Sequence, residues 1–377
     1  MQNQPILSSF RALLFLALSC GCTPSPDPAN IRFENPSGAT HSGGDRDIAM
    51  AAPIDGGQDG PGPAFQFEIA QIINDGAFGA AAIHLIDTAQ RRIDLVQFVM
   101  YDSGTVALIL DALIRARARG VMVRVLADEE AGQTRQALER LQNASITTRF
   151  DDPEVTTHNK MLIVDDQTLV GSHNFSANAM ERNRESSVWV KSPDVTAFYA
   201  AYFESLWQNT PKPDSADWSG DGDVIPIADR DIVTRLAQCI DAAQSRVRIV
   251  LYAMTYNRAY PDSDAIALVE ALVRAKGRGV QVQIALDGSD WIRENGINHT
   301  AMAVLLEGQV ELRTTPRHRV THAKVVNCDQ VVIVGDANWA HTSFALYNGT
   351  SIRLSGPENL AQFEKWFADI WSESEAL

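Results

Sequence analysis

Two stretches of the sequence carry the same set of residues able to do chemistry. THNKMLIVDD and, further on, THAKVVNCDQ both read His-x-Lys-x-x-x-x-Asp. On a β-strand, residues i and i+2 face the same side, so His158 and Lys160 should project together, as should His322 and Lys324. The apolar residues after each lysine should anchor the strand in the core. A polar pair built twice in one chain indicates a functional device rather than a chance pattern.

The residue types suit the cleavage of a phosphodiester. The segments GSHNFS and GDANWA follow the two motifs at the same offset and supply Asn174 and Asn338 at matched positions. The lysine ammonium groups and these amides would bind the non-bridging phosphate oxygens and offset their charge. One histidine would attack phosphorus and form a phosphohistidine. The other would protonate the leaving alkoxide and then activate water or an alcohol.

A metal site is the competing interpretation of histidine near aspartate. A lysine on the same strand face would repel a divalent cation, so the pattern disfavours a metal, and no cofactor is expected. The motif aspartates, Asp165 and Asp329, come at strand ends, where fixing a turn is a commoner role than direct chemistry. His173 and His341, close to the motifs, are interpreted as incidental polar residues.

The motifs belong to an internal repeat. RRIDLVQFVMYDSGTVALILDALIRARARGVMVRVLAD (91–128) aligns with SRVRIVLYAMTYNRAYPDSDAIALVEALVRAKGRGVQVQIALD (245–287). Each copy reads as a buried strand, a loop, a helix that ends in basic residues and glycine, and a second strand. The pattern predicts an α/β fold of two similar halves, each with strands sandwiched by helices. The Pro/Gly/Asp-rich stretch 209–223 marks their boundary.

The bulk composition is that of a globular protein. The chain has 377 residues, a length sufficient for two or three domains. Of these residues, 45% are hydrophobic and 21% are charged, which is ordinary for a globular protein. Its formal net charge of −15 argues against broad attraction to nucleic acid or to an anionic membrane surface. Four cysteines are too few for a disulfide scaffold, and there is no Cys-x-x-Cys metal pattern. Cys239 and Cys328 are interpreted as small buried apolar residues.

Residues 1–22 resemble a bacterial lipoprotein signal peptide. Arg11 precedes the apolar run ALLFLALS, which is too short to span a bilayer and is followed closely by cysteine. Cys20 or Cys22 is the expected lipidation site, and an ordinary secretory signal is the alternative. Residues 23–62, rich in Gly, Pro, Ser and Asp, are predicted to be a flexible tether.

The duplicated HxKxxxxD motif, with its asparagine segments, resembles the phospholipase D superfamily over residues 65–377. The resemblance implies two α/β/α sandwich halves, 63–215 and 216–377, packed about a pseudo-twofold axis around one metal-independent active site. The implied catalytic residues are His158, Lys160, His322, Lys324 and Glu185. Phosphate binding is implied for Asn174, Asn338, Lys160 and Lys324, and a structural role within the motif for Asp165, Asp329 and Ser172. Because both motifs lie in one chain, a monomer is expected.

The two halves differ after their asparagine segments. NRES supplies Glu185, which matches the glutamate of the family pattern, whereas NGTS supplies Thr350 in its place, shifted by one residue. Asp336 also stands where serine is usual. A carboxylate partner would orient its histidine, raise its basicity and stabilise the phosphorylated ring. His158 is therefore predicted to be the nucleophile, held by Glu185, and His322 the general acid and base. The departures also allow a weakened second half.

Three functions fit the pattern. The first is phospholipase D-type hydrolysis of phospholipids, or phosphatidyl transfer as in cardiolipin synthases, by a lipid-anchored protein of the bacterial envelope. It would face the periplasm, with the outer membrane favoured. The second is a nuclease of the same superfamily, which the acidic balance disfavours. The third is a non-catalytic phosphate-binding lipoprotein, which two intact His–Lys pairs disfavour. The first is preferred, since a lipid anchor would hold the enzyme beside its substrate.

Overall fold

The structure is a computed structural model that describes residues 70–128, 133–215, 218 and 222–377. The predicted signal peptide (1–22), with Cys20 and Cys22, and the predicted tether (23–62) lie outside the described residues. Within the described ranges, no helix combines the length and the apolar character that a bilayer span requires.

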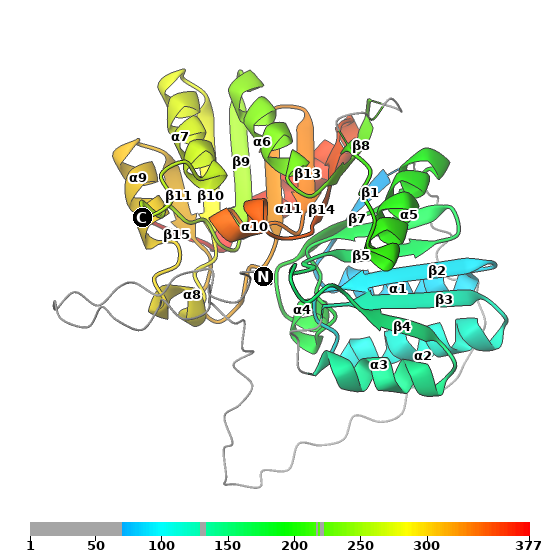
Figure 1. Ribbon diagram of the computed structural model, residues 1–377. Coiled ribbons are helices and arrows are strands. Elements are labelled where there is room, and N and C mark those ends of the chain that lie inside the picture. The colour runs from blue at the N-terminus through cyan, green and yellow to red at the C-terminus, as the bar shows by residue number, and fades with distance from the viewer. Residues whose placement is uncertain (1–69, 129–132, 216–217, 219–221) are drawn as a thin grey trace, which may run out of the picture. The chain divides into compact units, whose positions relative to one another are not determined.

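The first half is a seven-stranded mixed sheet with helices (Figure 1). Its strands run in the order β1-β7-β6-β5-β2-β3-β4. Along the chain the elements are β1 (Ala70–Asn74), α1 (Ala77–Thr88), β2 (Arg92–Gln97), α2 (Gly104–Ala118), β3 (Met122–Ala127), α3 (Thr134–Asn143), β4 (Thr147–Phe150), β5 (Lys160–Val164), β6 (Gln167–Gly171), α4 (Ala177–Glu181), β7 (Ser186–Lys191) and α5 (Pro193–Gln208).

The second half repeats this plan in an eight-stranded sheet of order β15-β11-β10-β9-β12-β13-β14-β8. Its elements are β8 (Val224–Ala228), α6 (Asp231–Ala242), β9 (Arg246–Leu251), α7 (Asp264–Gly277), β10 (Gln281–Leu286), α8 (Asp290–Glu294), α9 (His299–Glu307), β11 (Glu311–Thr314), β12 (Lys324–Cys328), β13 (Val331–Gly335), α10 (His341–Ala345), β14 (Thr350–Leu354), α11 (Pro357–Glu373) and β15 (Glu375–Ala376). The stretch 209–223 connects α5 to β8. The prediction of two similar α/β halves is confirmed.

The strand directions follow from the repeat. β2 lies parallel to β3, and β9 parallel to β10, because a helix crosses over between the members of each pair. Helices α2 and α7 end with basic residues in the last turn, and Gly120 and Gly279 follow with left-handed φ angles of 92° and 89°. The motif strands β5 and β12 then run antiparallel to β2 and β9. Both motifs therefore lie beside the first strand of their repeat.

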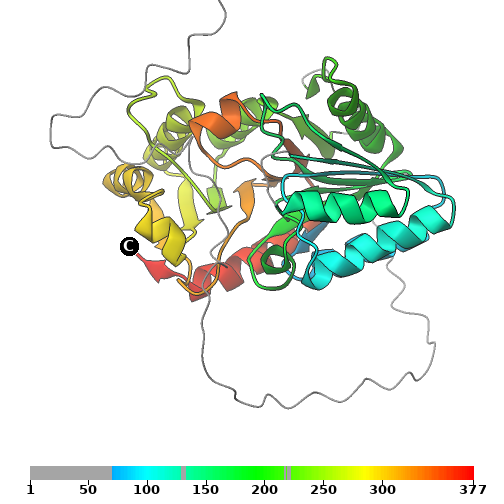
Figure 2. The same cartoon turned by 60° about the horizontal axis from the view of Figure 1, so that its bottom comes forward.

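The three largest clusters of buried side chains among the described residues form the core of the two halves. One lies between the first sheet and α1, α2 and α3, and a second lies between the second sheet and α6, α7 and α9 (Figure 1). The third joins residues of both sheets with α5 and α11, so the halves share a core. The Tyr199 hydroxyl of α5 donates to the carbonyl of Ser351 in β14 at 2.6 Å. In Figure 2 the red helix α11 passes the blue strand β1, where Gln362 accepts the N–H of Ile72.

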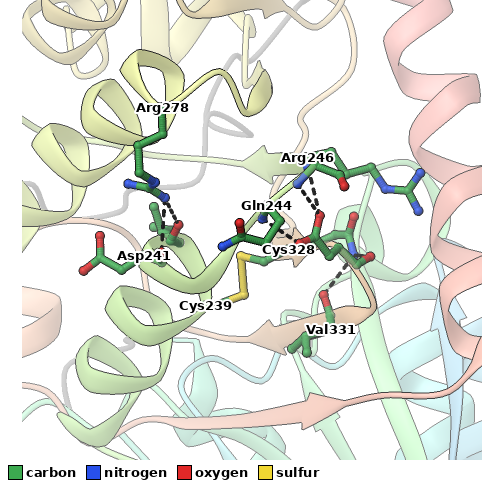
Figure 3. The surroundings of a disulfide bond; sticks show 11 residues. Cys239, Asp241, Gln244, Arg246, Arg278, Cys328 and Val331 are labelled. Carbon is green, nitrogen blue, oxygen red and sulfur yellow. Dashed lines mark hydrogen bonds between the residues drawn. A yellow bond between two sulfur atoms is a disulfide. The ribbon is translucent and has the colours of Figure 1, made fainter.

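The interpretation of Cys239 and Cys328 as unpaired apolar residues is wrong. Cys239 of α6 and Cys328 at the end of β12 form a disulfide with their Cα atoms 5.7 Å apart (Figure 3). Cys328 is buried, as expected of a small apolar residue, but the two cysteines are 89 positions apart, so no local spacing marks the pair. The bond ties α6 to the strand that carries the second motif.

Candidate active site

Each motif histidine lies just before its strand and is held there by the opposite half. β5 and β12 begin at the motif lysines, two residues after the histidines. The backbone N–H of His158 donates to the carbonyl of Asn348 at 2.9 Å, and that of His322 donates to the carbonyl of Arg184 at 2.8 Å. Asn348 belongs to the second half and Arg184 to the first. The geometry of each histidine therefore depends on both halves.

Two buried aspartates fix the residue that precedes each histidine. Asp128, after β3, accepts the N–H of Thr157 at 2.9 Å. Asp287, after β10, accepts the N–H of Thr321 and the hydroxyl of Ser289. Burial raises the pKa of Asp287 to about 6, although the hydrogen bonds from Ser289 and Thr321 oppose the rise. Neither aspartate was predicted from the sequence, although each copy of the repeat ends in Asp.

Two aromatic rings in equivalent positions flank the His–Lys pairs, and neither ring was predicted from the sequence. Phe98 follows β2 and Tyr252 follows β9. The Phe98 ring centroid lies 4.9 Å from that of His158 and 5.1 Å from the Lys160 ammonium nitrogen. Tyr252 has corresponding distances of 4.8 and 5.2 Å in the second motif. An aromatic face attracts the ammonium and limits where the lysine can move.

Glu185 contacts the histidine of the opposite half. Its Oε2 lies 3.1 Å from Nδ1 of His322 and accepts the Ser172 hydroxyl at 2.6 Å, while Asn183 donates to Oε1 at 3.2 Å. The prediction that Glu185 holds His158 is wrong. The loop that carries Glu185 crosses to pair with the segment before His322, so proximity in sequence does not give the partner.

Burial lowers the pKa of both motif histidines, with different opposing groups. Burial lowers the pKa of His322 to about 4, and the Glu185 carboxylate opposes the fall. The pKa of His158 lies well below its usual range because of burial and the charges of Lys160 and Lys324, which also lower the pKa of His322; the backbone carbonyl of Asp336 opposes the fall at His158. Burial would raise the pKa of Glu185, but its ion pair and hydrogen bond with His322 bring it down to about 2. The Glu185 carboxylate therefore favours the protonated form of His322.

In the second half, glycine stands where the first half has glutamate. Ser187 and Ser351 occupy equivalent places in β7 and β14, each opposite the glycine that ends the neighbouring strand. Glu185 lies two positions before Ser187, and Gly349 lies two positions before Ser351. Gly349 therefore occupies the position in the second repeat that Glu185 occupies in the first. Thr350, which the sequence analysis put in the glutamate's place, is one residue too far along.

Asp336 fills the space that this glycine leaves. It occupies the place of Ser172, it is 1% exposed, and its Oδ2 accepts the backbone N–H of Thr350 at 2.7 Å. A Cβ on Gly349 would lie 2.7 Å from its Oδ1. The first half thus combines a hydroxyl with a glutamate, whereas the second half has one aspartate in their place.

The motif lysines and asparagines complete the site. Lys160 and Lys324 are buried, and each Nζ donates to the carbonyl of its own motif histidine. Burial lowers the pKa of Lys160 to about 8 and lowers that of Lys324 well below its usual value. Asn174 and Asn338 follow β6 and β13, the neighbours of the motif strands. Each has a buried Oδ1 without a hydrogen-bond partner among the described residues, so one end of each amide is unsatisfied.

The sequence model of a family described as "Cardiolipin synthase, PLD-like domain" matches residues 82–207 and 236–371, one segment in each half. The chain belongs to this PLD-like family.

Similar proteins agree with the family. A phospholipase D of Rickettsia conorii is 37% identical over 116 residues, 30% of this chain and 56% of the relative. A mitochondrial cardiolipin hydrolase of Chlamydomonas reinhardtii is 26% identical over 124 residues, 32% of this chain and 54% of the relative. The chain thus spans about half the length of these curated relatives. The crystal structure of a Haemophilus influenzae phosphatidylserine synthase has the same fold, with a TM-score of 0.64 and 14% identity over 82% of this chain and 87% of that one.

The motif aspartates of this PLD-like chain lie away from the histidines and bind backbone. Asp165 accepts the N–H groups of residues 90–92, and Asp329 accepts those of residues 244–246. Both have left-handed φ angles, 53° and 49°, which aspartate tolerates better than most residues. Each carboxylate therefore fastens the turn after its motif strand to the start of the first repeat strand.

Other polar residues near the motifs have contacts of their own. The His173 ring contacts the hydroxyl of Ser187 and the carbonyl of Asp75 and stacks on Phe78. His341 stacks on Tyr260 with ring centroids 4.4 Å apart. Across the described residues, no group of three or more His, Cys, Asp or Glu side chains is arranged to hold a metal ion.

Proposed function

We propose that the chain cleaves phosphodiester bonds of phospholipids through a phosphohistidine, as a hydrolase or phosphatidyl transferase of the phospholipase D type. The observation that carries the proposal is the contact between Glu185 and His322, which links the two repeats at their motifs. The family match and the phospholipase D and cardiolipin hydrolase relatives support phospholipid as the substrate class.

His158 is proposed as the nucleophile and His322 as the general acid. The sequence suggested the same roles, but the structure supports a different reason for them. Lys160 and Lys324 disfavour the cation of either ring, but the Glu185 carboxylate favours the cation of His322. A bound phosphate anion would raise the pKa of both rings, and His322 would take up the proton first.

The proposed reaction has two steps. A nitrogen of His158 bonds to phosphorus while the bond from phosphorus to the leaving oxygen breaks, and Nε2 of His322 gives its proton to that oxygen. His322 then takes a proton from water or an alcohol, whose oxygen bonds to phosphorus as the bond to His158 breaks. Both histidines return to their starting states.

The lysines and asparagines would hold the phosphate during both steps. An ammonium group binds a non-bridging oxygen strongly in a buried site, because little water competes there. Lys160 and Lys324 are fixed by their own motif carbonyls and by Phe98 and Tyr252. We assign the remaining phosphate contacts to the side-chain NH₂ groups of Asn174 and Asn338, because an amide N–H donates to a phosphate oxygen.

The test compares substrates in the presence of EDTA. Purified protein is incubated with vesicles of phosphatidylcholine and phosphatidylethanolamine, with plasmid DNA and with single-stranded RNA, and the His158→Ala variant serves as a blank. Release of choline or ethanolamine is the expected result. Cleavage of DNA or RNA alone would replace this proposal by a nuclease. No turnover of any substrate would favour the non-catalytic phosphate-binding alternative.

We also propose that the protein acts in the bacterial envelope, anchored through Cys20 or Cys22. The disulfide between Cys239 and Cys328 supports an oxidising compartment outside the cytoplasm. Mass spectrometry of the mature N-terminus should find an acylated cysteine. A free N-terminus at another residue would rule out the anchor.

A further inference from the structure

Each motif lysine faces a buried carboxylate from the opposite half. Glu185, in the first half, is the charged neighbour that most favours the cation of Lys324 in the second half. Asp336, in the second half, reaches the first motif through Thr350: its Oδ2 accepts the Thr350 hydroxyl at 3.3 Å, and that hydroxyl accepts the side-chain amide of Asn159, the neighbour of Lys160, at 3.4 Å. Asp336 is also the charged neighbour that most favours the cation of Lys160. In both pairs the lysine and the carboxylate belong to different halves. The two carboxylates, however, come from different positions in the repeat.

The local structure explains how an aspartate can take over from a glutamate. In the first half the backbone N–H of Ser186 donates to the Ser172 hydroxyl at 3.0 Å, and that hydroxyl donates to Glu185. In the second half the corresponding N–H, that of Thr350, donates directly to Asp336. The Asp336 carboxylate therefore occupies the hydroxyl's place, and its second oxygen extends into the space where a side chain at position 349 would begin.

We propose that Asp336 is a positioning residue that supplies Lys160 with the carboxylate that Glu185 supplies to Lys324, and so keeps Lys160 a cation ready to bind phosphate. Among the contacts of the described residues, no hydrogen bond joins the Asp336 carboxylate to His158, whose pKa is instead raised by the Asp336 backbone carbonyl. The second half thus keeps a carboxylate for Lys160 of the first half but offers His158 no counterpart of the contact between Glu185 and His322. The phosphate-binding part of this inference rests on the proposed function.

The other charges near Lys160 set the background for the test. Glu185 and Asp128 also favour its cation, but less than Asp336 does, and burial opposes all three. The charges of Lys160 and His158 disfavour each other, as do those of Lys160 and Lys324. Burial raises the pKa of Asp336 itself to about 7, and the Lys160 cation opposes the rise.

The first experiment measures the lysine directly and needs no turnover. The sequence has six lysines, so their ε-carbons, labelled with carbon-13, can be resolved and titrated by NMR, and Lys160→Gln assigns one signal. Asp336→Asn should lower the pKa of Lys160 by about one unit, the loss expected for a nearby opposite charge. Glu185→Gln should instead act mainly on Lys324. Asp94→Asn removes a buried carboxylate that binds Arg92 and Arg124, and should leave Lys160 unchanged.

The second experiment moves the carboxylate. Asp336→Ser should lower the pKa of Lys160 as Asp336→Asn does. Adding Gly349→Glu rebuilds the Ser172–Glu185 arrangement in the second half, and the serine removes the atom that a side chain at position 349 would meet. The double variant should restore the Lys160 titration. A general packing role for Asp336 would not give this rescue, because the double variant changes the packing twice.

The outcomes separate this inference from the proposed function. An unchanged Lys160 titration in folded Asp336→Asn protein would overturn it, as would a double variant that leaves the pKa lowered. If Asp336→Asn does not fold, Asp336→Ser and the double variant replace it, and a Lys160 titration that equals the wild type in both would overturn the inference. Where turnover is measurable, Asp336→Asn should raise KM for the phosphodiester near pH 8 more than it lowers kcat. Absence of turnover in the wild type would refute the proposed function but leave the lysine titration as the test.

Discussion

Glu185 in the first repeat hydrogen-bonds His322, which lies 137 positions later in the second repeat. The backbone also makes contacts between the halves, because the N–H of each motif histidine donates to a carbonyl of the other half. Neither half therefore contains its own complete histidine environment. A substitution in one half is expected to act on the histidine of the other.

The first prediction is that Glu185→Gln behaves like a defect in His322. Without the carboxylate, His322 loses the group that favours its proton, so leaving groups that need protonation should depart more slowly. We expect kcat to fall by about 10²- to 10³-fold for a phospholipid, in line with losses seen for general acid catalysis. For a nitrophenyl phosphodiester, whose leaving group needs no proton, the first step should be nearly unaffected.

The control for this prediction is His322→Ala assayed with the same two substrates. Both variants should show the same dependence on the leaving group, and the double variant should be little worse than His322→Ala alone. Equal loss with both substrates, or a phenotype that instead matches His158→Ala, would show that Glu185 acts on the nucleophile.

The second prediction concerns alkaline pH. The pKa of Lys160 is lowered to about 8, so its positive charge is present below pH 8 and lost above it. We expect kcat/KM to fall above about pH 8, well before an ordinary lysine would titrate. Lys160→Arg keeps a positive charge at every accessible pH, so it should shift the alkaline limb upward even if its activity is lower. A profile that stays flat to pH 10 in the wild type would contradict the assignment.

The third prediction concerns the disulfide. The disulfide links Cys239 and Cys328, which are 89 positions apart. This cross-link lowers the conformational entropy of the unfolded chain and should stabilise the fold by about 4 kcal/mol. Denaturant unfolding of Cys239→Ala, or of the wild type in reducing agent, should show that loss. The Cys239→Ala variant should not respond further to the reducing agent. An equal free energy of unfolding with and without reductant would indicate that the pair does not form.

Most of the fold could be predicted from the internal repeat. Buried strands, basic helix ends and glycines are local features, so two strand–helix–strand units could be predicted from the residues in order. The motif aspartates could be placed for the same reason, because Asp165 and Asp329 each bind backbone next to the first strand of their own repeat. The missed residues Asp128 and Asp287 also follow the repeat, and a column-by-column comparison of the two copies would have found them.

The contacts between halves could not be predicted in this way. Glu185 was assigned to His158 because they share a repeat, whereas the partner is fixed by how the halves pair. Gly349 was overlooked because a one-residue shift in a loop is decided only by the strand register. The Cys239–Cys328 pair depends likewise on tertiary packing. Information about long-range partners is spread over the whole core, and a single sequence does not display it.

The last prediction tests which histidine forms the covalent bond. Rapid quenching of a reaction with a phosphorus-32-labelled phosphodiester should leave the label on His158, found by peptide mapping under alkaline conditions that preserve phosphohistidine. His158→Ala should abolish both the label and turnover. His322→Ala should still form the label with a nitrophenyl substrate, and the label should persist longer, because no base activates the water that releases it. Label on His322, still formed in His158→Ala, would reverse the roles. In that case Glu185 would stabilise the phosphorylated ring rather than the proton donor, and Glu185→Gln would shorten the life of the intermediate on His322.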